Sequence, residues 1–253
     1  MSRIAMTTLR RGAFFALALP LSLVLAACGS KDEDTLPKGD AIARIAPPAG
    51  QEWVDIAAET PEGGVVVGNP DAPIKLLEYA SHTCPHCSDF SAEAAAPLRD
   101  KYIASGVVSY ELRNQIHDSI DLTAAMLVRC SGPQAFHPLA EQFWQNLGAI
   151  VQNVQNNNEA MAKASEAPEA QRYQAIAEAA GMIDFFAARG IPRDQAMKCL
   201  ADPAKAREIL DRSNKQSDEL KVTGTPTFFV NGKNIGTQSW KTLEPILQNA
   251  GAR

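Results

Sequence analysis

The sequence predicts an α/β fold in which one sheet is interrupted along the chain by an all-helical subdomain. Two observations predict it. First, β-prone segments occur in two separate regions, before residue 113 and again at residues 227–236. Second, the intervening residues 118–220 are rich in Ala, Gln, Glu and Lys and carry apolar residues at helical spacing. The order strand, helix, strand, helical block, hairpin and helix is satisfied by a single sheet with a helical insertion.

Residues 1–27 have the pattern of a secretory signal. Arginines precede an apolar stretch at 12–27, which ends in Leu25-Ala26-Ala27-Cys28. This stretch is shorter than the roughly 20 apolar residues that a membrane-spanning helix needs. A retained transmembrane helix is nevertheless one alternative. Its end resembles the cleavage box of bacterial lipoproteins, which implies that Cys28 becomes the lipidated first residue of the mature chain. An ordinary cleavage site with an accidental cysteine is the other alternative.

Residues 28–60 are expected to form a lipidated, flexible tether. The segment from Gly29 to about Thr60 is rich in Lys, Asp, Pro, Gly and Ala and lacks a sustained apolar period. About thirty flexible residues have an r.m.s. reach near 30 Å, enough to hold a domain clear of lipid headgroups.

Residues 61–117 are expected to form the first part of the sheet domain. Gly63–Gly68 is a short β-prone run, Ile74–Tyr79 reads as a second strand, and Val107–Leu112 alternates like a third. A helix is predicted between the last two, from Ser88 to Ser105. Its apolar residues recur at helical spacing, namely Phe90, Ala94, Leu98, Tyr102 and Ile103.

The helical block at 118–220 is followed by the second part of the sheet domain, 221–253. Thr227–Val230 and Lys233–Gly236 flank Asn231-Gly232, which is the strongest short-range signal of a β-hairpin. A last helix is predicted over Ser239–Asn249. Breaks between helices of the block are expected at Gly132-Pro133, Gly148, Asn156-Asn157-Asn158, Pro168, Gly181, Gly190-Ile191-Pro192 and Pro203.

Cys84 and Cys87 belong to a Cys-Pro-His-Cys motif between a predicted buried strand and a helix N-terminus. Such a pair can form a disulfide or share a metal ion. A structural zinc ion needs two further ligands at suitable distance, and the sequence holds no second Cys-x-x-Cys. We therefore expect a redox pair, with neither a metal nor an organic cofactor.

The position of Cys84 predicts a reactive thiolate. Unpaired backbone N–H groups and the dipole of the helix stabilise an anion there, which lowers the pKa of a thiol. The imidazolium of His86 would add to this effect. Cys84 is thus the expected nucleophile and Cys87, one turn inward, the resolving thiol, with Pro85 and His86 completing the catalytic motif.

The segments on either side of this motif resemble the DsbA family of thioredoxin-fold proteins. Leu77-Glu78-Tyr79 leads into the motif, and the sequence GTPTFFVNG follows far downstream at 224–232. The likeness covers roughly Gly63 to the C-terminus. It implies a thioredoxin fold, a helical block that caps the redox site, and a strongly oxidising disulfide.

The resemblance also assigns roles to further residues. It implies a cis peptide between Thr225 and Pro226, beside the cysteines, that offers backbone groups to an extended substrate; a trans proline opening a strand is the alternative. Glu78 matches a buried acid that tunes Cys87 or relays protons, the alternative being a carboxylate that faces solvent. Thr225 stands where the best-known oxidase has Val. Isomerases and reductases also use Thr, so the direction of electron flow stays open.

Cys130 and Cys199 remain after Cys28 and the redox pair have been assigned. Export would place both in an oxidising compartment, and we expect a structural disulfide between them, as in some DsbA-like proteins. Two unrelated buried thiols and a second catalytic pair are the alternatives.

Three histidines lie outside the motif. His82 is near the predicted active loop and either contacts substrate or satisfies backbone groups. His117 and His137 are expected to be structural or exposed.

These features predict a thiol-disulfide oxidoreductase that donates disulfides to exported proteins through Cys84 and Cys87. Reduced exported proteins are the expected substrates, and the resemblance implies a membrane redox partner of DsbB type. The lipid anchor would hold the protein on a membrane of the cell envelope, in the periplasm. The net charge of -5, without a basic cluster beyond the N-terminus, argues against nucleic-acid binding. The alternatives are a reductase or isomerase of the same fold and a non-catalytic peptide-binding lipoprotein.

Overall fold

The computed structural model describes residues 39–253. The predicted signal, Cys28 and the first part of the predicted tether lie outside these residues. The elements are η1 (Trp53–Asp55), β1 (Ala57–Glu59), β2 (Val65–Val67), β3 (Ile74–Ala80), α1 (Pro85–Pro97), η2 (Leu98–Ile103), β4 (Val108–Asn114), α2 (Ser119–Val128), η3 (Arg129–Ser131), α3 (Pro133–Gln145), α4 (Leu147–Asn156), α5 (Asn158–Glu166), α6 (Glu169–Ala179), α7 (Met182–Ala187), α8 (Arg193–Leu200), α9 (Pro203–Leu220), β5 (Thr227–Val230), β6 (Lys233–Gly236) and α10 (Trp240–Asn249). Within this part of the chain, no helix combines the length and apolar character needed to cross a bilayer.

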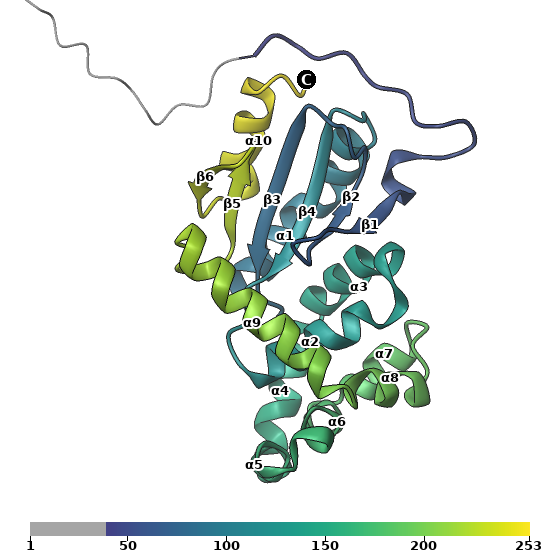
Figure 1. The fold of residues 1–253 in the computed structure, drawn as a ribbon, viewed down its shortest axis with the longest axis vertical. Coiled ribbons are helices and arrows are strands. Elements are labelled where there is room, and N and C mark those ends of the chain that lie inside the picture. Colours follow the sequence, from purple (N-terminus) through teal and green to yellow (C-terminus); the bar gives the residue numbers. More distant parts are fainter. Residues whose placement is uncertain (1–38) are drawn as a thin grey trace, which may run out of the picture. The chain divides into compact units, whose positions relative to one another are not determined.

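Six strands form one mixed sheet in the order β1-β2-β4-β3-β5-β6 (Figure 1). β3 pairs in parallel with β4 and antiparallel with β5. A parallel pair needs a crossover connection, and α1 supplies it. Because β3 and β4 are parallel, the segments that follow them leave the sheet at the same edge, and the cysteine motif follows β3.

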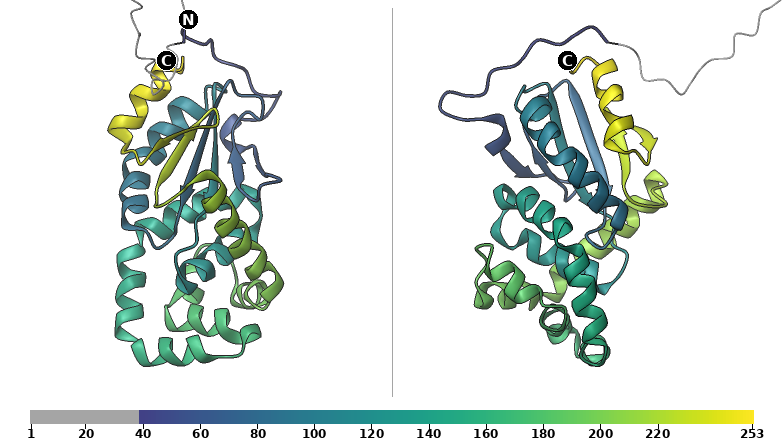
Figure 2. Two further views of the ribbon diagram at one scale, coloured as in Figure 1. Left: turned by 60° about the vertical axis from the view of Figure 1, so that its left-hand side comes forward. Right: turned by 180° about the vertical axis from the view of Figure 1, so that it is seen from behind.

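Alternate residues of β3 point to opposite faces of the sheet, and both faces are covered. Ile74 and Leu76 belong to the large core, whereas Leu77 and Tyr79 pack in a smaller cluster with Phe229. In the view from behind, α1 lies across one face of the sheet (Figure 2), and α9 passes on the other side (Figure 1). Glu78 has the parity of Leu76, so its carboxyl faces the large core.

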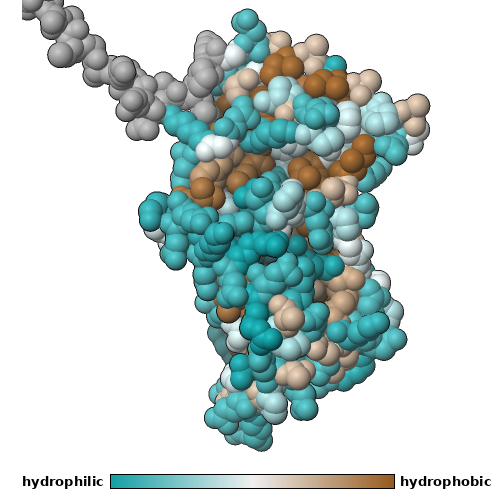
Figure 3. Space-filling model, in the orientation of Figure 1, coloured by the Kyte–Doolittle hydropathy of each residue, from teal (hydrophilic) through white to brown (hydrophobic). Residues whose placement is uncertain are grey.

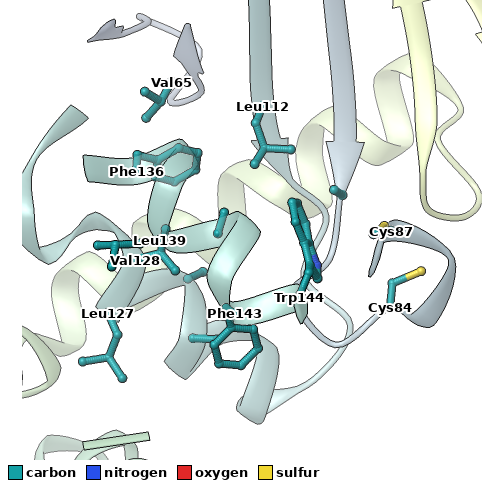
Figure 4. Packing of buried hydrophobic residues seen from close by; sticks show 14 of the residues in the cluster. Val65, Cys84, Cys87, Leu112, Leu127, Val128, Phe136, Leu139, Phe143 and Trp144 are labelled. Atoms are coloured by element: carbon teal, nitrogen blue, oxygen red, sulfur yellow. The ribbon is translucent and has the colours of Figure 1, made fainter. Parts of the chain in front are cut away.

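The helical block, α2 to α9, lies beyond the carboxyl ends of β3 and β4 (Figure 1). Its central helix is α2, in which residues 121–128 are all buried, as expected for a helix covered on every side. Leu127 and Val128 of this helix belong to the same buried cluster as Phe136 and Phe143 of α3 (Figure 4). The outer surface over the block is mainly hydrophilic, while hydrophobic side chains gather on the upper half of the same face (Figure 3).

The prediction of a flexible tether over residues 28–60 is wrong from residue 39 onward. The backbone N–H groups of Gly39 and Ile42 donate to Asn249 and Gly251, and that of Ile45 donates to Ser105. Further along, Trp53 is buried, and β1 adds an edge strand to the sheet. The polar composition hid these contacts because a few anchoring apolar residues and edge pairing suffice to order such a segment.

Three helix boundaries also differ from the prediction. The helix after the cysteine motif begins at Pro85, three residues before Ser88, because proline suits the first helical position. Its last part, η2, is a π-helix that ends at Ile103. In the block, Gly148 lies inside α4, and the break falls at Asn146 instead.

Candidate active site

The two cysteines of the motif lie at the start of α1, and both are free thiols. Cys84 occupies the N-cap position with an extended backbone, and Pro85 follows inside the first turn. Cys87 is fully buried beneath them. This arrangement exposes the Cys84 sulfur to the first-turn N–H groups and places Cys87 one turn into the helix.

The surroundings of Cys84 lower the pKa of its thiol to about 5. The largest cause is the hydrogen bond from the Cys87 thiol, which burial of Cys84 partly opposes. The Thr225 side chain and the backbone N–H groups of Cys87 and His86 then add smaller contributions. A thiolate at this position is the expected consequence at neutral pH, and it is the reactive form of cysteine.

Cys87 has the opposite electrostatic environment. Burial raises the pKa of its thiol above the ordinary range, and the hydrogen bond to Cys84 and the charge of Glu78 raise it further. Two thiols three residues apart therefore carry different protonation states, with Cys84 as thiolate and Cys87 as thiol. This division is the one that an attacking and a resolving cysteine require.

His86 contributes through its backbone. Its side chain is 80% exposed and lies 3.8 Å from Asp89, one turn along α1. The contact that lowers the pKa of Cys84 comes from the His86 backbone N–H. The contribution of the His86 imidazolium that the sequence suggested stays a prediction.

The peptide between Thr225 and Pro226 is cis, as the resemblance implied. It precedes β5, and the Cys84 sulfur lies 3.2 Å from the Thr225 carbonyl oxygen. Residues 141 positions apart in sequence are thereby brought together at one edge of the sheet. The alternative of a trans proline is wrong.

Glu78 lies below the cysteines and is 1% exposed. Its Oε2 accepts a hydrogen bond of 2.6 Å from the Tyr110 hydroxyl, whereas its Oε1 is buried without a partner. Burial is the main cause that raises the pKa of this carboxyl to about 8, against the lowering effect of the Tyr110 bond. The alternative of a solvent-facing carboxylate is wrong.

The raised pKa of Glu78 predicts a pH-dependent stability of the reduced protein. A carboxyl whose folded pKa exceeds its unfolded value of 4.5 favours the folded state at low pH, and this contribution is lost as pH rises to about 8. The loss should be on the order of 4 kcal/mol. Glu78→Gln should therefore raise the free energy of unfolding, relative to the native protein, progressively between pH 5 and pH 9. Urea unfolding across that range checks it, and parallel curves for the two proteins would contradict it.

The roles of Asp121, His117 and Trp144 at the site were not predicted from the sequence. Asp121 of α2 is buried, and its carboxylate accepts hydrogen bonds from the backbone N–H of His82 at 2.8 Å and of His117 at 3.0 Å. The Nε2 atom of His117 in turn lies 3.3 Å from the Thr225 hydroxyl. Trp144 of α3 donates its indole N–H to the Ser81 carbonyl and faces the cysteine turn (Figure 4).

These contacts tie the helical block to the redox loop. His82 stacks on Trp144 and is buried, so it serves the packing of the loop rather than its surface. Asp121 holds the segments after β3 and β4 together. In the sequence, an acidic residue in the first turn of a predicted helix indicates only stabilisation of that helix. The contacts of Asp121 with distant segments therefore had no signal in the sequence.

A disulfide joins Cys130 to Cys199, between η3 and α8. It closes a loop with a sequence separation of 69 residues, within the helical block. His137, elsewhere in the block, is buried and hydrogen-bonded to the Val65 carbonyl. Between residues 39 and 253, no group of three or more His, Cys, Asp or Glu side chains is arranged to hold a metal ion.

Removing this disulfide should destabilise the protein. By the chain-entropy account, closing a loop of this length stabilises the folded state by about 4 kcal/mol. We expect Cys130→Ala/Cys199→Ala to lower the free energy of unfolding by that order, with the ultraviolet signal of the Cys84 thiolate unchanged. Denaturant unfolding of the oxidised proteins measures it. A loss below about 1 kcal/mol would contradict the expectation.

Comparison with known proteins defines the family. The family model described as Thioredoxin matches residues 60–249, and the chain belongs to this family. A solved protein-disulfide isomerase from Novosphingobium aromaticivorans is 33% identical, with 73% of this chain and 96% of that chain covered and a TM-score of 0.68. The solved alpha-DsbA1 of Wolbachia pipientis, 23% identical, has the same fold, with coverage of 74% and 90% and a TM-score of 0.59. Within the family, the chain is thus a DsbA-like thioredoxin-fold protein with a helical insertion, as the sequence predicted.

A relative in Rickettsia felis carries the name "Putative protein-disulfide oxidoreductase" and is 25% identical over 197 residues. The match covers 78% of this chain and 63% of that protein. The chain spans a little under two thirds of the length of the Rickettsia relatives that it matches.

Proposed function

We propose that this protein is a thiol-disulfide oxidoreductase that donates its Cys84–Cys87 disulfide to reduced exported proteins. The observation that carries the proposal is the division of protonation states, with the pKa of Cys84 lowered to about 5 and that of Cys87 raised by burial. A low-pKa thiol is a good leaving group, and stabilising it favours the reduced enzyme, which makes the disulfide an oxidant.

The mechanism is two successive exchanges. A substrate thiolate attacks the Cys84 sulfur of the disulfide, a mixed disulfide forms, and Cys87 leaves and takes up a proton. A second substrate thiolate then attacks the substrate sulfur of the mixed disulfide and releases Cys84 as thiolate. The substrate has lost two electrons and the cysteine pair has gained them, so no organic cofactor or metal takes part.

Surrounding residues serve this exchange. The Thr225-Pro226 backbone is the substrate-binding segment, since the Thr225 carbonyl lies 3.2 Å from the reactive sulfur. Glu78 is the proton donor and acceptor for Cys87. This role is supported by the effect of its charge, which raises the pKa of the Cys87 thiol. The Cys130–Cys199 bond is structural.

The first residues support an exported, lipid-anchored location. The signal pattern at 1–27 and the Leu25-Ala26-Ala27-Cys28 box support export and lipidation at Cys28, with the folded domain in the periplasm. A membrane partner of DsbB type would reoxidise the cysteine pair. Residues 39–60 pack on the domain and therefore do not belong to a flexible tether.

A second candidate function is disulfide isomerisation or reduction. Thr225 before the cis proline and the name of the Novosphingobium structure favour it. The test offers the oxidised protein a reduced, unfolded protein with several cysteines and, separately, offers the reduced protein a stable disulfide. We expect rapid disulfide formation in the first reaction and slow reduction in the second. The reverse order would assign the protein to reduction, and no exchange in either would reject both functions in favour of peptide binding.

A further inference from the structure

A cavity of about 350 Å³ lies among α1, α3, η1 and the large-core face of the sheet. Its walls are mostly apolar, and the lining includes Val67, Phe90, Ala94, Ala95, Leu98 and Ala140. The lining also extends from the buried Glu78 to the exposed Asp55, Arg99 and Gln134. The cavity therefore connects the acid below the cysteines with solvent on the flank of the domain, away from the Cys84 surface.

The inner end of the cavity holds an unpartnered acceptor. Glu78 lines it, and the Oε1 of this residue is buried without a hydrogen-bond partner, while Oε2 is occupied by Tyr110. A buried carboxyl oxygen without a partner is costly unless water reaches it. A cavity of about 350 Å³ has room for several water molecules, and the polar groups on its otherwise apolar wall are the places where they would bind.

Further polar groups line the cavity between its two ends. Ser91 and His137 are buried, and the histidine Nε2 donates to the Val65 carbonyl, which leaves Nδ1 as an acceptor. Glu141 of α3 is half-buried. The titratable and charged groups that line the cavity are Asp55, Glu78, Arg99, Tyr110, His137 and Glu141.

We propose that this cavity is a water-filled path along which protons pass between solvent and Glu78, with Glu141 as the proton-exchanging group near the outer end. The inference rests on the proposed function and deepens it, because it assigns the route by which the Cys87 proton enters and leaves. Ser91 and the His137 Nδ1 hold the intervening water.

The electrostatics of the lining suit this role. Burial raises the pKa of Glu141, against the lowering effect of Arg99. Burial also lowers the pKa of His137 to about 4, so that this ring stays neutral near pH 7 and acts through hydrogen bonds. Glu78, with a pKa of about 8, can both give and take a proton near neutral pH.

The step that depends on the path is the closure of the Cys84–Cys87 disulfide. When Cys84 carries a mixed disulfide, the Cys87 sulfur attacks the Cys84 sulfur, the bond to the departing thiolate breaks, and the Cys87 proton passes to Glu78 and on to cavity water. In the opposite direction, Cys87 leaves as a thiolate and takes a proton by the same path. Cys87 is fully buried, so solvent cannot serve it directly.

The test uses two pairs of variants, each made of one substitution at the cavity and one matched control. The first pair replaces a glutamate and the second pair replaces an alanine of α1. Glu141→Gln removes the proton-exchanging group and keeps its shape, with the exposed Glu93→Gln as control. Ala95→Leu fills the cavity, and Ala96→Leu places the same side chain in solvent on the next residue. The reduced proteins are mixed with oxidised glutathione, and the concentration-independent phase of the tryptophan fluorescence change reports the attack by Cys87.

We expect Glu141→Gln and Ala95→Leu to slow this phase about tenfold and to enlarge its solvent isotope effect. The rate should fall less than it would on loss of a direct proton donor, because water persists in the path. The controls should match the native protein, and the ultraviolet titration of Cys84 should be unchanged in all four. Native rates and isotope effects in both cavity variants would overturn the proposal. A protein with no glutathione exchange at all would instead reject the proposed function.

A measurement on the unmodified protein keeps the inference testable if a cavity variant does not fold. The infrared carbonyl band of protonated Glu78, identified by its absence in Glu78→Gln, should shift within the mixing time on transfer into D₂O. Rapid exchange supports a hydrated path. A band that persists for minutes would show that water does not reach Glu78 and would overturn the proposal.

Discussion

Replacing Cys84 by serine should abolish disulfide exchange. The thiolate at the N-cap of α1 is the only group of the pair with a lowered pKa, and an alcohol in its place is neither ionised nor able to form a disulfide. We expect the rate of oxidation of a reduced protein to fall by at least about 10⁴-fold, the scale on which removal of a catalytic nucleophile acts. A stopped assay with thiol quantification measures it.

Cys87→Ser is the matched variant for this experiment. It keeps the reactive thiolate but lacks the resolving thiol, so it is offered a substrate disulfide. Attack by Cys84 releases one substrate thiolate and leaves a mixed disulfide that should accumulate as a stable adduct visible by mass. Cys84→Ser should give no such adduct. Substantial activity in the Cys84 variant, or adducts formed through Cys87, would reject the assignment of nucleophile and resolving thiol.

The second large effect is on the relative stability of the reduced and oxidised forms. A thiol whose folded pKa of about 5 lies below its unfolded value of 9.0 stabilises the folded state at high pH, and this contribution disappears as pH falls through 5. At pH 7 it should amount to about 2 kcal/mol after allowance for solvent screening. Only the reduced protein carries this thiolate.

We therefore expect the stability of the reduced form to gain on that of the oxidised form between pH 5 and pH 9. The comparison isolates Cys84, because its thiol titrates only in the reduced form. Burial, the main cause of the raised pKa of Glu78, should act in both forms and largely cancel in the difference. Urea unfolding of the two forms at each pH measures the gain. A difference that stays constant from pH 4 to pH 8 would be inconsistent with a stabilised Cys84 thiolate.

Local sequence patterns were sufficient for the elements that build the site. The alternation of β4, the Asn231-Gly232 turn and the Cys-x-x-Cys spacing each reflect interactions within a few residues, and these predicted the strand, the hairpin and the redox pair. The likeness to DsbA supplied what local patterns do not contain, namely the cis peptide at Pro226 and the burial of Glu78.

The remaining features depend on contacts between distant segments. The hydrogen bonds of Asp121 to the backbone of His82 and His117 join the segments that follow β3 and β4 to α2 of the helical block. The ordered segment from Gly39 onward is likewise held by the C-terminal residues. Neither of these two features produces a periodic pattern of apolar residues in the sequence, because each depends on single residues and not on one face of a helix or strand.

The equilibrium redox potential of the Cys84–Cys87 disulfide tests most directly whether this disulfide is a strong oxidant. The measurement equilibrates a soluble form that starts after Cys28, with Cys130 and Cys199 retained, in glutathione buffers of known ratio. Stabilisation of the Cys84 thiolate predicts a potential less negative than about -180 mV. A potential near about -270 mV, typical of a reductant of this superfamily, would contradict disulfide donation and assign the protein to reduction.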